Sequence, residues 1–166
     1  CQYEPTQLVF LQRALELDDR ALIAARVTFP EHVPNQIPVF AVLHVLIIIS
    51  AQGDPFLAVT YSSDWVEHYK ERRFLEIDPV IQTGFRRLLP LDWDGFARSD
   101  ERVKSLFGEA SEFGLGRRGL SIPVHGRRGD RGLFSISCDH SDRDWARDKL
   151  HYLRDFQVLA THIHDK

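Results

Sequence analysis

The stretch EFGLGRRGLSIP (residues 112–123) places Gly114, Gly116 and Gly119 in the spacing G-x-G-x-x-G. In dinucleotide-binding proteins this fingerprint follows a strand and begins a helix, so that the pyrophosphate meets the helix N-terminus. Here the order is reversed, because a helical pattern precedes the glycines and a strand pattern follows them. We therefore predict that Gly114 ends a helix, and that Gly116 and Gly119 supply backbone freedom for the return into a sheet. A nucleotide site is not expected.

The elements on either side of these glycines can be predicted from their apolar patterns. A helix is expected before Gly114, with one apolar face made of Val103, Leu106, Phe107, Ala110 and Phe113. After the glycines, residues 119–125 and 132–138 alternate as a hairpin across the loop 126–130. One face of the hairpin is apolar, whereas the other includes Ser121 and Ser135. This pattern favours a sheet between helix layers, with a semi-polar ligand on one side.

Two further helices have start signals in the middle of the chain. Asp64, with Glu67 three residues later, forms a capping-box pattern and predicts a helix over residues 65–74. Asp78 followed by Pro79 predicts another, since aspartate is a good N-cap and proline suits the first helical position.

The segments before residue 62 and after residue 140 also have recognisable patterns. Helical spacing is found in residues 6–27, a proline-rich connection in residues 30–38, and strand patterns in residues 39–50 and 56–61. Ser141 begins a long C-terminal helix, whose shared side is formed by Trp145, Leu153, Phe156, Ala160 and Ile163.

Composition limits the kinds of partner. With 21 basic and 24 acidic residues among 166, the net charge is −3, which excludes the positive field that drives binding to a phosphate backbone. The two cysteines are far apart, as in proteins of the reducing cytosol. The longest apolar run is about half of what crosses a bilayer, so no membrane segment is expected. The sequence contains no methionine, and we interpret the chain as a piece of a longer protein.

Five side chains suggest a ligand site. Trp65 and Tyr69 are four residues apart and share a helix face, Tyr61 ends the preceding strand, Asp78 caps the next helix, and Ser135 lies on the semi-polar sheet face. If this face looks at the sheet, the site would hold several donors and one acceptor, which suits a neutral ligand with one amide N–H and several carbonyls. The same residues are also typical of core aromatics and an ordinary helix cap.

The joint spacing W-x3-Y-x8-D-P-x13-W, from Trp65 to Trp93, with Gly119 before SIPVHG, resembles the ligand-binding domain of LuxR-type quorum-sensing transcription factors. The resemblance covers roughly residues 56–138. It implies an α/β/α sandwich around a five-stranded antiparallel sheet, with an N-acyl-homoserine lactone between the sheet and one helix layer. Residues 1–166 would then form this autoinducer-binding domain, and a helix-turn-helix DNA-binding domain would lie outside the chain.

The resemblance also implies roles for individual residues. Trp65 would donate its indole N–H to the lactone carbonyl, and Asp78 would accept the ligand's amide N–H. Tyr61 and Ser135 would hydrogen-bond the acyl carbonyl, while Tyr69 would pack along the acyl chain. The lactone end would be walled by Trp93, Ala110 and Leu115, with Leu106 nearby, and the pocket or its tail end lined by Leu57, Val80, Ile81, Leu133 and Ser121.

The resemblance further implies a cytoplasmic homodimer that contacts DNA only through the C-terminal domain. It implies no catalytic residue, metal or cofactor, the lactone being a signal ligand. Two alternatives remain open. One is a dimerising module of the same fold without specificity for acyl-lactones. The other is a lactone hydrolase, because THIHDK (residues 161–166) contains part of an H-x-H-x-D-H metal motif.

Overall fold

The computed structural model describes residues 44–50, 56–96, 100–126 and 131–164. The elements predicted within residues 1–43 and most of the loop 126–130 lie outside the described residues. So do the side chain of Leu57 and those of the motif after Thr161.

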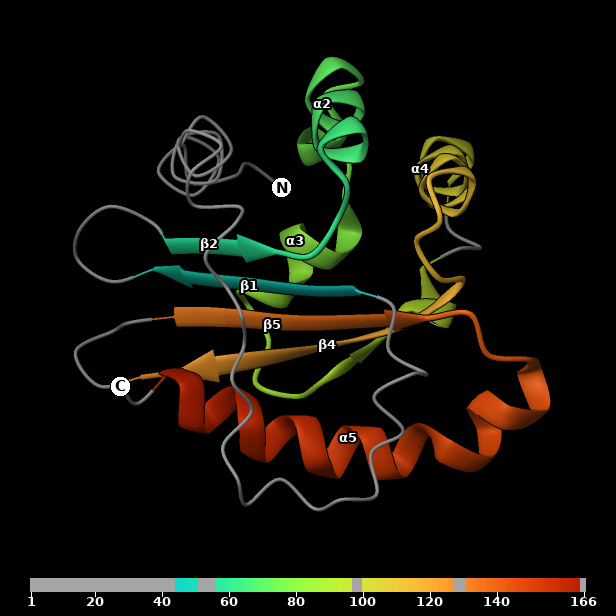
Figure 1. Cartoon of the computed structure of the whole chain (residues 1–166). Coiled ribbons are helices and arrows are strands. Elements are labelled where there is room, and N and C mark those ends of the chain that lie inside the picture. Colours follow the sequence, from blue (N-terminus) through green and yellow to red (C-terminus); the bar gives the residue numbers. More distant parts are fainter. Residues whose placement is uncertain (1–43, 51–55, 97–99, 127–130, 165–166) are drawn as a thin grey trace.

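The described strands form one sheet in an α/β fold, as expected for the fold class (Figure 1). Each strand is antiparallel to its neighbours. From one edge to the other the order is β2 (Phe56–Val59), β1 (His44–Ser50), β5 (Arg131–Cys138), β4 (Arg118–His125) and β3 (Leu91–Asp92).

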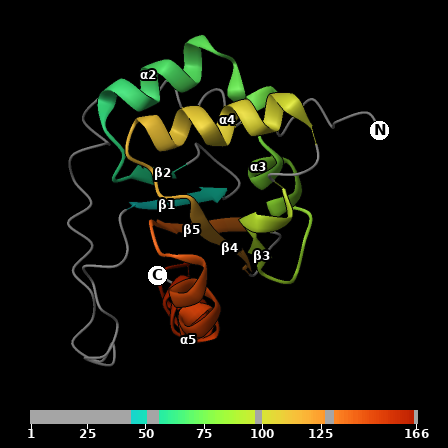
Figure 2. The same ribbon diagram turned by 90° about the vertical axis from the view of Figure 1, so that its right-hand side faces the viewer.

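Helices cover both faces of the sheet (Figures 1 and 2). Of the described helices, α5 (Asp142–His164) lies against one face, while α2 (Ser63–Glu71), α3 (Pro79–Gly84) and α4 (Glu101–Glu112) lie over the other. Two 3-10 turns, η2 (Phe74–Glu76) and η3 (Trp93–Gly95), lie in the connections. We call the side covered by α2, α3 and α4 the upper face of the sheet.

The apolar side of the hairpin packs on α5, as its alternation predicts. Ser141 begins this helix, since its hydroxyl accepts the N–H of Asp144 at 3.2 Å. Burying a large apolar side chain contributes about 1.5–3 kcal/mol, so this layer is a main source of stability. The buried residues of this layer are Leu120, Ile122, Val124, Phe134, Ile136, Cys138, Trp145, Tyr152, Phe156, Leu159 and Ala160.

Gly114 ends α4, which confirms the first part of our interpretation of the glycine motif. Its φ is +81°, a left-handed value that favours glycine. The N–H of Gly114 donates to the carbonyl of Ser111 at 3.0 Å, and that of Leu115 to the carbonyl of Ala110 at 2.9 Å. These two bonds form a Schellman motif, so the helix stops here and the chain turns toward the sheet.

The interpretation of Gly116 and Gly119 was wrong, because neither has a positive φ. Their role is close approach. A Cβ at Gly116 would overlap the main-chain carbonyl of Cys138, and one at Gly119 would overlap the indole ring of Trp93. Glycine is therefore required where α4 leads back to the sheet, and where Trp93 lies directly on strand β4.

Two local predictions also need correction. The N-cap of α2 is Ser62, whose hydroxyl accepts the N–H of Trp65 at 3.3 Å. Asp64 lies in the first turn, where its negative charge interacts favourably with the positive end of the helix dipole. The predicted capping box was therefore wrong, and the helix ends at Glu71 rather than Phe74. Strand β3 was not predicted, because a two-residue strand is too short for a periodic pattern.

Candidate functional site

The upper face of the sheet brings together most of the predicted site residues. Tyr61, Trp65, Tyr69, Ala110 and Leu115 belong to one cluster, which we call the aromatic cluster. It is completed by Phe74, Ile77, Leu106 and Phe113. Residues from the end of β2, from α2 and from the end of α4 therefore meet there. The convergence of Tyr61, Trp65 and Tyr69 was predicted from the residues, whereas Ala110 and Leu115 were implied by the resemblance.

Trp65 lies at the centre of the aromatic cluster, with only 3% of its surface exposed. Its ring centroid is 5.8 Å from that of Tyr69, in an edge-on arrangement, and 5.4 Å from that of Phe113. A third ring, Phe74, lies 6.0 Å away. Edge-on and tilted aromatic pairs at these distances are favourable, so the indole is held in one orientation.

Asp78 joins the start of α3 to the aromatic cluster. Its Oδ1 accepts the N–H of Val80 at 2.8 Å and that of Ile81 at 3.3 Å, which is the predicted N-cap. Its Oδ2 accepts the hydroxyl of Tyr69 at 2.9 Å, a contact that was not predicted. Each carboxylate oxygen accepts about two hydrogen bonds, so Oδ2 retains capacity for a second donor.

The protonation states of the phenols follow from this environment. Burial, and secondarily the charge of Asp78, raises the pKa of Tyr61 and of Tyr69. Both hydroxyls therefore remain protonated at neutral pH and can donate hydrogen bonds. Burial also raises the pKa of the Asp78 carboxyl, an effect opposed by the hydrogen bonds from Tyr69 and from the start of α3.

Val80 and Trp93 lie outside the aromatic cluster, in a second apolar cluster beside it. There they pack with Ile81, Phe85 and Leu133, between α3, η3 and strand β5. The structure thus divides the predicted residues between two neighbouring groups on the same face of the sheet.

A chain of hydrogen bonds joins Trp93 to the sheet. The indole N–H of Trp93 donates to Oγ of Ser121 at 2.8 Å, and Oγ of Ser121 lies 2.7 Å from Oγ of Ser135. With Trp93 as donor, the Ser121 hydroxyl can donate its hydrogen bond to Oγ of Ser135, which leaves the Ser135 hydroxyl able to donate to another group. Trp93 was predicted only as a wall, so its role in orienting these serines is new.

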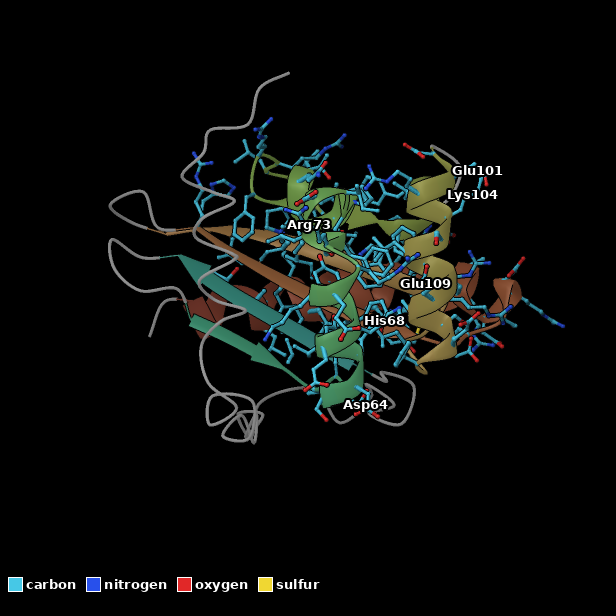
Figure 3. The ribbon with its side chains drawn as sticks, turned by 90° about the horizontal axis from the view of Figure 1, so that it is seen from above. Asp64, His68, Arg73, Glu101, Lys104 and Glu109 are labelled. Atoms are coloured by element: carbon cyan, nitrogen blue, oxygen red, sulfur yellow. The ribbon has the colours of Figure 1, made fainter. Side chains whose placement is uncertain are left out.

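Glu109 forms a polar junction between α2 and α4 that was not predicted. His68 Nε2 lies 2.7 Å from its Oε2, and Arg72 donates to both its oxygens, from Nε at 3.1 Å and Nη2 at 2.9 Å. Ser105 adds a hydrogen bond at 2.5 Å. Figure 3 shows His68 and Glu109 facing each other from the two helices. The His68 ring also lies 5.9 Å from the Trp65 ring, which links this junction to the aromatic cluster.

Glu109→Gln is expected to reduce the free energy of unfolding by roughly 1 kcal/mol at neutral pH. Hydrogen bonds, first from Arg72 and then from Ser105, lower the pKa of Glu109 from 4.5 to about 2. A lowered folded-state pKa stabilises the fold above the unfolded value, and this contribution disappears as the pH falls from about 4.5 toward 2.

Urea unfolding at several pH values checks this prediction. The difference between wild type and Glu109→Gln should shrink through that acid window, whereas the exposed Glu112→Gln should show little difference at any pH. A constant difference between wild type and Glu109→Gln down to about pH 2 would contradict it.

The described residues contain no group of three or more His, Cys, Asp or Glu side chains that could hold a metal ion. None of the helices described is both long enough and apolar enough to cross a membrane.

Sequence comparison connects this site with known proteins. Residues 43–166 match the autoinducer binding domain family. The transcriptional activator RaiR of Rhizobium etli is 38% identical over 117 residues, covering 70% of this chain and 48% of RaiR. The transcriptional activator VanR of Vibrio anguillarum is 34% identical over 103 residues, covering 61% of this chain and 42% of VanR. The chain spans about half the length of these curated relatives.

A solved structure shares the fold. It is the N-acylhomoserine lactone dependent LuxR family transcription factor CepR2 from Burkholderia cenocepacia, with a TM-score of 0.60 and 18% identity. The match covers 96% of this chain and 93% of that chain. At this identity the likeness supports the arrangement of the elements.

Proposed function

Because the chain belongs to the autoinducer binding domain family, we propose that it senses an N-acyl-homoserine lactone, held between the upper face of the sheet and the helices α2, α3 and α4. The curated relatives are transcriptional activators, and this supports the proposal that the chain is the ligand-sensing domain of a LuxR-type regulator. Because these relatives are transcriptional activators, the comparison favours a receptor over a lactone hydrolase.

The observation that carries this proposal is the meeting of Asp78 with the aromatic cluster. The carboxylate accepts the Tyr69 hydroxyl and lies close enough to Tyr61 to raise its pKa. One acceptor and several N–H and O–H donors are thus gathered beside apolar rings. An acyl-homoserine lactone has one amide N–H and carbonyl oxygens beside a hydrocarbon tail, so its groups complement this set.

In this proposal each polar group of the ligand has at least one partner in the protein. Trp65 donates to the lactone carbonyl, Asp78 accepts the amide N–H, and Tyr61 and Ser135 donate to the acyl carbonyl. The Trp93–Ser121–Ser135 chain supports the last role, since it leaves the Ser135 proton available.

Apolar contacts supply the other part of the affinity. Tyr69 packs along the acyl chain, Trp93, Ala110 and Leu115 wall the lactone, and Val80 lines the pocket. A neutral hydrogen bond contributes about 1 kcal/mol and a buried methylene about 0.8 kcal/mol, so the tail supplies affinity while the head group sets orientation.

The remaining expectations extend the proposal to the whole regulator. We propose that residues 1–166 act as the sensing domain of a cytoplasmic homodimer. DNA would be contacted by a C-terminal helix-turn-helix domain outside this chain. The net charge of −3 supports this division, because this part of the protein has no basic excess of its own.

Ligand-linked stabilisation tests the proposal. A ligand that binds only the folded state, at 100 times its Kd, adds about 2.7 kcal/mol, which corresponds to a rise in Tm of roughly 5–10 °C for a domain of this size. We expect this rise with at least one lactone from a panel of acyl-homoserine lactones of different tail length. The ring-opened acids serve as controls and should have little effect.

The same samples separate the alternatives. Mass spectrometry should recover the lactone intact after incubation, whereas its conversion to the ring-opened acid would identify a hydrolase. An unchanged Tm across the whole panel would instead favour a module of the same fold that does not recognise acyl-lactones.

A further inference from the structure

Ser137 has a buried hydroxyl that its surroundings do not satisfy. It lies two residues beyond Ser135 on β5, so both side chains point to the upper face of the sheet. Only 2% of Ser137 is exposed, and its Oγ has no hydrogen-bond partner within the described part of the chain. The neighbouring hydroxyls of Ser121 and Ser135 are bonded to each other. Because leaving a buried hydroxyl unpaired is costly, Ser137 requires an explanation.

The position of Ser137 in the sheet relates it to the aromatic cluster. Its register partner on β4 is Gly119, on which the Trp93 ring lies. The next residue of β5 is Cys138, whose carbonyl group packs against Gly116. Gly116 follows Leu115, a member of the aromatic cluster. Ser137 therefore lies at the end of β5 where the chain from α4 reaches the sheet.

The other unpartnered polar atoms differ from Ser137 in their location. Within the described residues they are Nδ1 of His140 and Nε1 of Trp145. Trp145 is a residue of α5 and belongs to the core between this helix and the opposite face of the sheet. The His140 ring lies beside Tyr152 of the same core. Of these atoms, only Ser137 Oγ is on the face that holds the proposed site.

We propose that Ser137 is a further ligand-binding residue, whose hydroxyl donates a hydrogen bond to an oxygen of the lactone head group. The inference rests on the proposed function, in which Trp65, Ala110 and Leu115 surround the lactone. A carbonyl oxygen accepts two hydrogen bonds, so Ser137 and Trp65 can share the lactone carbonyl. Ser135 and Ser137 thus have different tasks, the first at the acyl carbonyl and the second at the ring.

The substitution Ser137→Ala has two expected effects of opposite sign. Without ligand, removing an unpaired hydroxyl should raise Tm by about 2–4 °C. With N-octanoyl-homoserine lactone, the lost hydrogen bond should weaken binding about fivefold. Ser135→Ala is the informative contrast, since it removes the hydrogen bond between Ser121 and Ser135, leaving Ser121 with Trp93 alone, and should lower Tm without ligand. Ser111→Ala, at an exposed position of α4, is the neutral control.

Thermal unfolding and titration calorimetry on the whole 166-residue chain measure both effects. The panel adds N-octanoyl-cyclopentylamine, whose ring has no oxygen atoms. Ser137→Ala should bind this analogue as tightly as wild type does. An equal loss for both ligands, a fall in Tm without ligand, or an unchanged affinity for the lactone would each overturn the assignment of Ser137. If wild type bound none of these compounds, the proposed function itself would fail.

Discussion

Asp78→Asn is expected to weaken binding of an acyl-homoserine lactone by about 10- to 100-fold, because a hydrogen bond to a charged group contributes about 1.5–3 kcal/mol. Asparagine caps a helix about as well as aspartate, so α3 should still begin at the same residue. The substitution removes the charged acceptor Oδ2, which also accepts the hydrogen bond from the Tyr69 hydroxyl. Titration calorimetry gives the affinity, and thermal unfolding without ligand shows that the fold persists.

Asp100→Asn is the matched control for this substitution. Asp100 is the N-cap of α4 and accepts the N–H of Arg102 at 2.8 Å, on an exposed part of the surface. The same chemical change at this cap should leave lactone affinity unaltered. Equal affinities for wild type and Asp78→Asn would mean that Asp78 has only a structural role, as the cap of α3 and the acceptor of the Tyr69 hydroxyl.

Gly116→Ala is expected to destabilise the fold by about 3 kcal/mol, which lowers Tm by roughly 6–12 °C. The added methyl group would overlap the main-chain carbonyl of Cys138. A side chain could move aside, but here the obstacle is the backbone of a central strand. Both the strand and the turn after α4 must therefore shift.

Gly108→Ala provides a control of opposite sign. Gly108 lies inside α4, and a Cβ there would have no atom of a described residue within 4 Å apart from its chain neighbours and the nearby helix backbone, so alanine should stabilise the helix by about 0.5–1 kcal/mol. Thermal unfolding of both variants tests the contrast. A Tm for Gly116→Ala at or above that of wild type would refute the close-approach explanation of this glycine.

The helix boundaries that depend on neighbouring residues could be predicted from sequence. Asp78 with Pro79 correctly marked the start of α3, and Gly114 the end of α4. The start of α2 was ambiguous, because Ser62 and Asp64 are both good N-caps two residues apart. Propensity cannot choose between them, since the choice depends on which residue leaves the preceding strand with extended backbone angles.

The hydrogen-bonded serines could have been found from the hairpin. A loop over residues 126–130 is centred on residue 128, and a symmetric hairpin about that centre pairs residue 121 with residue 135. The structure has this register, with Ser121 opposite Ser135. Alternation along each strand gives only the shared face of the two serines, whereas the pairing rule also brings their hydroxyls together.

The contacts of Glu109 and of Trp93 with distant elements were not predicted from the sequence. Glu109 bonds to His68 and Arg72, which are 41 and 37 residues away along the chain. The local signal is limited to two pairs at a spacing of four residues, His68 with Arg72 and Ser105 with Glu109. Polar pairs at this spacing usually lie on the solvent-exposed side of a helix. The contact of Trp93 with Gly119 is of the same kind, because it depends on how η3 lies on β4. Packing of separate elements decides these contacts.

A crystal structure of the chain with N-octanoyl-homoserine lactone would test the central claim most directly. We expect the ligand on the upper face of the sheet, with its amide nitrogen about 3 Å from a carboxylate oxygen of Asp78 and its lactone carbonyl at a similar distance from the indole nitrogen of Trp65. A lactone bound elsewhere, or bound at this face with neither contact formed, would contradict the account.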